Sequence, residues 1–121
     1  MNFLLDTNAL IHLQSGKLAV PLPEGAYGIS VITEIELLSW PQLQSDAELV
    51  WRGLLAKFRR VDLEAQVCEA AIRLRRQHRL RLPDAIIAAS ALVCHAILLT
   101  NDQRLLTIPD VRSQSVALKQ G

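Results

Sequence analysis

Four acidic residues stand where a predicted strand ends or a predicted helix begins. They are Asp6, Glu36, Asp84 and Asp102. Asp6 directly follows the apolar run NFLL, and Asp102 follows the apolar run AILLT. Glu36 and Asp84 lie near the starts of two predicted helices. Because ligands of open α/β sheets bind at the carboxyl ends of the strands, neighbouring strands would bring the four carboxylates into one pocket.

Such a group of acids indicates a cation. Carboxylates crowded in a partly buried site repel one another unless positive charge neutralises them. Oxygen ligands of this kind suit Mg²⁺ or Mn²⁺ rather than zinc. One or two such ions can activate water and stabilise an in-line displacement at phosphorus. The pattern therefore points to hydrolysis of a phosphodiester.

Each acid also has a purely structural interpretation. Asp6 could be only a helix N-cap, and Asp102 only a turn residue. Glu36 pairs with Thr33 as T-x-x-E, the pattern of a capping box. Asp84 follows a proline, where an acid complements the helix dipole. The structural interpretation requires four such coincidences, and spacing alone leaves both interpretations open.

The elements that must position the acids alternate between strand and helix. Predicted strands cover residues 2–5, 26–32 and 96–100, residues 59–63 form a connector or a strand, and residues 114–118 are a candidate edge strand. Predicted helices follow Asp6 or Asn8 and cover residues 33–40, 45–58, 64–78 and 84–96, with a turn and a short helix in residues 101–106. This order predicts an α/β fold with a mostly parallel sheet. The chain contains no repeat or low-complexity linker, which indicates one domain over residues 1–121.

Local signals mark several of these helices. Ser45 and Glu48 form a capping box before one helix, and Asp62 is the expected N-cap of the long amphipathic helix. That helix places Val67, Ala71 and Leu74 on one face. The next helix, DAIIAASALVCHA, is apolar nearly all round and is therefore expected at the centre of the fold.

Composition sets wider bounds. Half of the 121 residues are apolar but only 4% are aromatic, so Leu, Ile, Val and Ala must build the core. The net charge of +1 neither demands nor excludes a nucleic-acid partner. Cys68 and Cys94 show no metal-type spacing and are interpreted as buried free thiols. No signal peptide or membrane-length apolar run is found, which predicts a soluble cytoplasmic protein.

Four patches of sequence resemble one known family. They are LLDTNAL (4–10), ISVITEIELL (29–38), LPDAIIAASAL (82–92) and LLTNDQRL (98–105). The chain resembles the PIN-domain family, and within it the VapC-type ribonuclease toxins of bacterial toxin–antitoxin pairs. The patches occur in the family's order and span most of the chain, although the segment between the second and third patches differs from many members.

The resemblance implies a PIN-like α/β/α sandwich and a Mg²⁺- or Mn²⁺-dependent endoribonuclease. Its metal-binding and catalytic acids fall on Asp6, Glu36, Asp84 and Asp102. Glu34 is then an extra acid, which we expect to point to solvent. The resemblance also implies an antitoxin partner, a homodimer, and contact with DNA only through the antitoxin.

Polar neighbours of the acids could orient the carboxylates and a bound ion. They are Thr7, Asn8, Ser30 and Thr100. For Thr7 and Ser30, a helix cap or a strand-end hydroxyl is an equally good interpretation. An arginine run before Asp84 suits RNA phosphates, and its loop members Arg79 and Arg81 are the best candidates for phosphate contact. The alternative is a solvated helix face.

Two other functions compete with this interpretation. The chain could be a catalytically silent PIN-fold module that binds RNA or a protein. It could instead be a phosphatase of small esters, but no D-x-D follows the first strand, where Asn8 stands. Neither a G-x-S-x-G elbow nor a P-loop is present. His12, His78 and His95 show no ligand spacing and receive no role. Trp40 and Trp51 are assigned either to a partner surface or to the core.

Overall fold

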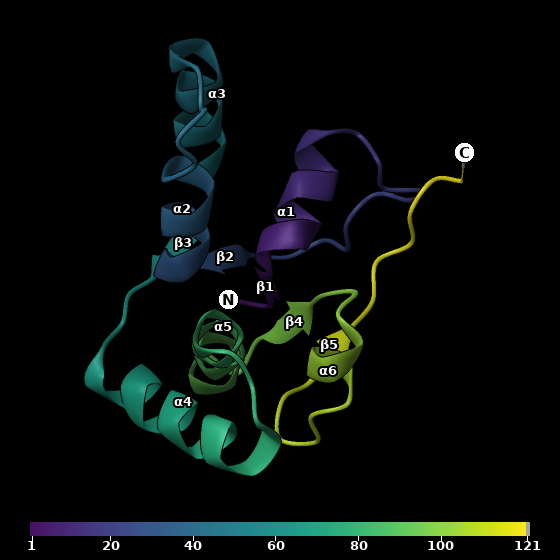
Figure 1. The fold of residues 1–121 in the computed structure, drawn as a ribbon. Coiled ribbons are helices and arrows are strands. Elements are labelled where there is room, and N and C mark those ends of the chain that lie inside the picture. The colour runs from purple at the N-terminus through teal and green to yellow at the C-terminus, as the bar shows by residue number, and fades with distance from the viewer. Residues whose placement is uncertain (121) are drawn as a thin grey trace.

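The structure, a computed structural model, describes residues 1–120 (Figure 1). Strands and helices alternate along most of the chain. The strands are β1 (Phe3–Leu5), β2 (Tyr27–Ser30), β3 (Arg59–Val61), β4 (Ile97–Leu99) and β5 (Ser113–Gln114). The helices are α1 (Thr7–Gln14), α2 (Val31–Leu38), α3 (Ser45–Leu55), α4 (Ala65–His78), α5 (Leu82–Val93) and α6 (Gln103–Leu106).

All five strands belong to one sheet in the order β3-β2-β1-β4-β5, and every neighbouring pair is parallel. β1 is central, with Leu5 opposite Ile29 of β2 and Leu99 of β4. The predicted α/β fold with a mostly parallel sheet is thus confirmed. Because parallel strands end at the same edge, the residues that follow β1 and β4 emerge side by side.

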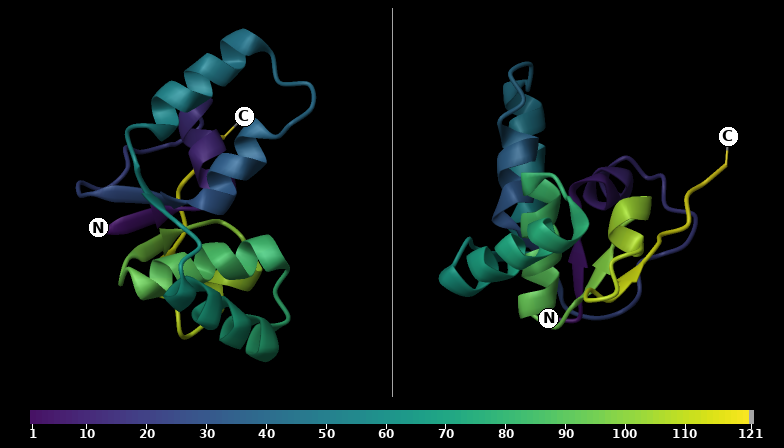
Figure 2. Two further views of the ribbon diagram at one scale, coloured as in Figure 1. Left: turned by 90° about the vertical axis from the view of Figure 1, so that its left-hand side faces the viewer. Right: turned by 60° about the horizontal axis from the view of Figure 1, so that its bottom comes forward.

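Side chains of the strands alternate between two apolar cores, one on each face of the sheet. Leu5 and Leu99 belong to the core formed with α1, α2 and α3, whereas Leu4 and Leu98 belong to the core formed with α4, α5 and α6. Figures 1 and 2 show α1 and α3 on one side of the sheet and α4 and α5 on the other. This arrangement is the expected α/β/α sandwich.

α5 packs between the sheet and α4. Residues 85–91 of this helix are all buried, and its four alanines have at most a trace of exposed surface. The predicted inward face of α4, with Val67, Ala71 and Leu74, packs in the same core. α5 begins at Leu82, two residues earlier than predicted, because a proline is tolerated in the first turn of a helix. Asp84 therefore lies within that first turn.

The start of α2 differs from the prediction. β2 pairs with β3 only as far as Ser30, and the Ser30 hydroxyl then accepts the N–H of Ile32 at 3.1 Å as the N-cap. Val31 and Ile32 are consequently helical rather than extended. Thr33 lies inside the helix, so the capping-box interpretation of Thr33 and Glu36 is wrong.

Two other predicted caps are also wrong. Gln44 rather than Ser45 is the N-cap of α3, and Glu64 rather than Asp62 is the N-cap of α4. Asp62 instead pairs with Arg60 at 2.7 Å, which removes it from the helix end. α2, α3 and α5 also end two or three residues before the predicted ends at residues 40, 58 and 96.

The last predicted strand is shifted. β5 comprises Ser113–Gln114 rather than residues 114–118, and Leu118 forms an isolated antiparallel bridge with Leu18. The Asn101 side chain holds this segment, because it donates to the Val116 carbonyl at 3.0 Å and accepts the Val116 N–H at 2.8 Å. A side chain just after β4 thus replaces the strand pairing expected of residues 115–118.

Both cysteines are free thiols, as expected, although each is half-buried rather than fully buried. Cys68 lies in α4 and Cys94 caps the end of α5. Within residues 1–120, no helix has the length and apolar character needed to cross a membrane.

The packing of α5 predicts a strong dependence on side-chain size. Ala88→Leu should lower the free energy of unfolding by about 1–3 kcal/mol, because Ala88 is 0% exposed and the added atoms have no space. Ala65→Leu, at the exposed first position of α4, should change it by less than about 0.5 kcal/mol. Urea denaturation of both variants tests this; equal stability of the two would contradict the tight packing of α5.

Candidate active site

Asp6 is the most buried of the four predicted acids, with 5% of its surface exposed. One carboxylate oxygen, Oδ1, accepts the Ala9 N–H at 2.8 Å as the N-cap of α1, and Oδ2 accepts the hydroxyl of Thr100. Burial raises the pKa of Asp6 above its ordinary value, although these two hydrogen bonds lower it. The charges of Asp102 and Asp84 raise the pKa further, so both acids lie near Asp6.

Thr100 connects the ends of the two central strands. Its side chain is fully buried just after β4, and its hydroxyl donates to Asp6 while accepting the Asp102 N–H at 3.0 Å. Asp102 is the N-cap of α6 and accepts the Arg104 N–H at 2.8 Å. The Thr100 hydroxyl therefore orients the carboxylate of Asp6 and also holds the backbone of Asp102.

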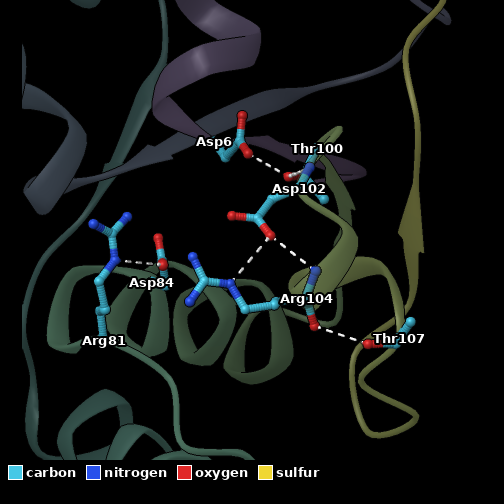
Figure 3. A network of polar contacts seen from close by, with 7 residues as sticks. All are labelled: Asp6, Arg81, Asp84, Thr100, Asp102, Arg104 and Thr107. Atoms are coloured by element: carbon cyan, nitrogen blue, oxygen red, sulfur yellow. Dashed lines mark hydrogen bonds and ion pairs between the residues drawn. The ribbon is translucent and has the colours of Figure 1, made fainter.

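Asp84 completes a group of three acids. It enters from the first turn of α5, on the other side of this edge from α1, and its side chain is 16% exposed. Figure 3 shows Asp6, Asp84 and Asp102 directed toward a common space. The side chain of Asp102 is 29% exposed, so this space opens to solvent.

Glu36 belongs to a separate hydrogen-bonded group, which it forms with the hydroxyl side chains of Thr7 and Thr33. It is exposed on α2 and accepts the Thr7 hydroxyl at 2.7 Å. The Thr7 and Thr33 oxygens are 3.0 Å apart. Since the single Thr7 proton goes to Glu36, Thr33 must be the donor in this second bond. The buried Thr33 thus orients Thr7, and Thr7 orients Glu36.

Arginines occupy part of the acidic surface. Arg81 Nε lies 3.4 Å from Asp84 Oδ2, and Arg104 Nε lies 4.0 Å from Asp102 Oδ1. Within the described chain, no three Asp, Glu, His or Cys side chains stand together in the arrangement of a metal centre. The donors that do converge are carboxylate oxygens, and the most buried one has a raised pKa. This donor set fits a hard divalent cation such as Mg²⁺ or Mn²⁺.

Other predicted residues lie outside this network. Asn8 is exposed, Ser30 serves as the cap of α2, and Arg79 is an exposed C-cap of α4 in the left-handed conformation. Glu34 does not simply point to solvent, because it pairs with Arg60 at 3.0 Å. Only Arg81 of the two predicted phosphate-binding arginines reaches the acids.

Two residues of the network were missed in the sequence. The T-x-x-E pattern predicts only a cap at Thr33, although the wider spacing S-x-x-T-x-x-E of Ser30, Thr33 and Glu36 is a signal that could have found it. Arg104 follows Asp102 by two residues, and no sequence signal distinguished it from other surface arginines. Their roles depend on where α2 begins and how α6 is oriented.

Known proteins share this fold. A complex described as a toxin–antitoxin complex from Klebsiella pneumoniae contains a chain that is 31% identical, with 91% of this chain and 95% of that chain covered and a TM-score of 0.79. VapBC-1 from nontypeable Haemophilus influenzae is 25% identical over 95% of this chain and 98% of the other, with a TM-score of 0.74. DNA-bound VapBC from Salmonella typhimurium is 21% identical over the same shares, with a TM-score of 0.78.

No curated protein matches this chain significantly. The PIN domain model, however, matches residues 3–111, which include all four predicted acids and the whole network around them. A match of this extent, together with the shared fold, assigns the family. The chain belongs to the PIN-domain family.

Proposed function

We propose that this protein is a Mg²⁺- or Mn²⁺-dependent endoribonuclease and the toxin of a toxin–antitoxin pair. The observation that carries this proposal is the convergence of Asp6, Asp84 and Asp102 at the carboxyl edge of the sheet. There, burial and, to a smaller extent, the charges of Asp102 and Asp84 raise the pKa of Asp6. PIN domains are generally nucleases, which supports the class of reaction.

The four acids would bind the ion in this proposal. When bound, the ion supplies Lewis-acid chemistry that activates water and stabilises the charge developing on the phosphate. Asp6 is the fixed ligand, because Ala9 and Thr100 hold both of its oxygens. Glu36 is exposed on α2, where the Thr7 hydroxyl holds its carboxylate, and it would complete the set of ligands. In the proposed hydrolysis the water oxygen would bond to phosphorus, the ester P–O bond would break, and one proton of the water would end on the leaving oxygen.

An antitoxin partner is part of the same proposal. The solved relatives include toxin–antitoxin complexes, some of them bound to DNA. The region of α2 and α3 exposes large apolar side chains, with Trp40 61%, Leu49 71% and Val50 53% exposed, whereas Trp51 packs against the core. We infer that this surface is covered by the antitoxin or by a second copy in a homodimer, and that DNA is contacted only through the antitoxin. We also infer one domain and action on cytoplasmic RNA.

Removal of one carboxylate should abolish cleavage. Asp84→Asn should reduce metal-dependent cleavage of RNA by roughly 100-fold or more, because it removes a negative charge from the ion's ligands. Asp46→Asn makes the same change at an exposed position of α3 and should leave cleavage unchanged. Cleavage of a panel of structured and single-stranded RNAs, with Mg²⁺, Mn²⁺ or chelator, measures both effects.

The same panel separates the competing functions. Cleavage that persists in chelator or in Asp84→Asn would contradict the metal-nuclease proposal. A folded, antitoxin-free wild type that cuts no RNA would favour the binding module. Turnover of a small phosphate ester without RNA cleavage would favour a phosphatase.

The raised pKa of Asp6 predicts that removing its charge stabilises the metal-free fold, although the same change would remove a proposed metal ligand. The folded state holds the Asp6 proton more tightly than the unfolded chain, so this group's contribution is greatest below its ordinary pKa and is lost as pH rises through the raised pKa. Asp6→Asn, whose side-chain oxygen can still cap α1, should therefore make the metal-free protein more stable than the wild type at neutral pH.

Thermal unfolding in chelator across acid to neutral pH tests this prediction. The advantage of Asp6→Asn should grow with pH and nearly vanish in acid. Added Mn²⁺ should stabilise the wild type but not the variant, because only the wild type retains the carboxylate. A variant that is less stable than the wild type at neutral pH without metal would contradict the predicted cost of the buried charge.

Thr33 should act through Thr7 and Glu36. Thr33→Val keeps the shape but removes the donor to Thr7, and should lower kcat/KM by roughly tenfold. Thr33→Ser retains the hydroxyl and should stay close to the wild type. Equal activity of the Val and Ser variants, with similar melting temperatures, would show that this hydroxyl does not position Glu36.

A further inference from the structure

Two arginine side chains reach the acidic site from the same two helices that carry acids. Arg81 precedes α5 and pairs with Asp84, and Arg104 lies in α6 and pairs with Asp102. Figure 3 shows the Nε of Arg81 facing Asp84 and the guanidinium of Arg104 beside Asp102. Asp6 differs from its two neighbours, because its hydrogen bonds come from Thr100 and the Ala9 N–H, which are uncharged donors.

Helix formation does not explain these positions. Arg81 is the N-cap of α5 and makes no capping hydrogen bond there, and Arg104 is the second residue of the four-residue helix α6. The helix dipole disfavours a cation at the N-terminus of α5, and a guanidinium has no acceptor for the free N–H groups at the start of either helix. The carboxylates therefore account for the direction of both side chains.

Both arginine–carboxylate ion pairs are weak enough for a divalent ion to displace the arginine. The arginine side chains are 70% and 62% exposed, and the N–O distances of 3.4 Å and 4.0 Å are at the long end for ion pairs. Solvent screens such pairs strongly. A divalent ion bound by Asp6, Asp84 and Asp102 together with Glu36 would displace the arginines from their carboxylates. The two guanidinium groups would then stand beside an already neutralised site.

We propose that Arg81 and Arg104 neutralise Asp84 and Asp102 while no divalent ion is bound, and that they turn to the phosphates of the RNA backbone when the ion takes the carboxylates. This inference rests on the proposed function, and it assigns Arg81 and Arg104 to the binding of the RNA substrate of the proposed nuclease. A guanidinium matches either partner, because its planar donors bond carboxylates and phosphates with the same geometry.

The first consequence concerns metal affinity without RNA. The double variant Arg81→Gln/Arg104→Gln should bind Mn²⁺ roughly threefold to tenfold more tightly than the wild type in isothermal titration calorimetry, because the ion no longer competes with arginine. Arg52→Gln is the matched control, since it breaks an exposed arginine–glutamate pair of 2.8 Å on α3. Its Mn²⁺ affinity should equal that of the wild type.

The second consequence concerns nucleic acid. A fluorescein-labelled oligouridylate, with Ca²⁺ in place of Mn²⁺, should bind the double variant more weakly than the wild type or Arg52→Gln. The slope of log affinity against log salt should fall by about 1.4, because each phosphate of a single strand that the protein neutralises adds about 0.7 to that slope. The two single variants should each show about half of this change in slope.

The outcomes separate this inference from the proposed function. If the wild type binds and cleaves with Mn²⁺ but the double variant has unchanged Mn²⁺ affinity, the exchange is wrong and the nuclease proposal stands. Unchanged oligouridylate affinity and salt slope in the double variant would contradict the proposal that Arg81 and Arg104 bind RNA phosphates. If the wild type binds no Mn²⁺ at all, both the exchange and the proposed function fail.

Discussion

Negative charge held at one edge of the sheet is the constraint on which the rest of the structure depends. Each of the three converging acids stands at the start of a helix: Asp6 caps α1, Asp102 caps α6, and Asp84 lies in the first turn of α5. Free N–H groups and the helix dipole favour carboxylates at such positions. The same three carboxylates therefore stabilise the starts of helices and converge at one edge of the sheet. A structural role for each acid is thus compatible with a role in the proposed metal site.

The rest of the fold stabilises this concentration of charge. Asp6 follows Leu4 and Leu5, which are fully buried in opposite cores, so the strand cannot shift to expose the carboxylate without uncovering an apolar side chain. Apolar burial on both faces of the sheet thus offsets the unfavourable desolvation of one acid. Such a local cost is typical of functional sites, where stability and activity place different demands on the same residue.

The sequence predicts the acids better than the groups that orient them. Asp6 and Asp102 could be placed together because parallel strands share a carboxyl edge, which requires only the strand order. Thr33 could not be placed, because its position depends on where β2 ends, and that is set by pairing of Ser30 with Val61 of a distant strand. Arg104 was missed for a similar reason, since its partner depends on the direction of a helix of four residues. Long-range pairing and helix orientation have no local signal.

The location of Glu36 relates the acidic site to the exposed apolar surface. Glu36 and Ile35 are neighbours on α2, and Ile35 is 54% exposed. Leu49 and Val50 on α3 are exposed apolar side chains as well. Successive helical residues point about 100° apart, so one helix presents an acid to the site and an apolar side chain to a different face. A partner that covers the apolar face of α2 therefore lies within one helical turn of Glu36. If the antitoxin of the proposed pair docks on this face, it would bury Ile35 and at the same time restrict the approach of RNA to Glu36.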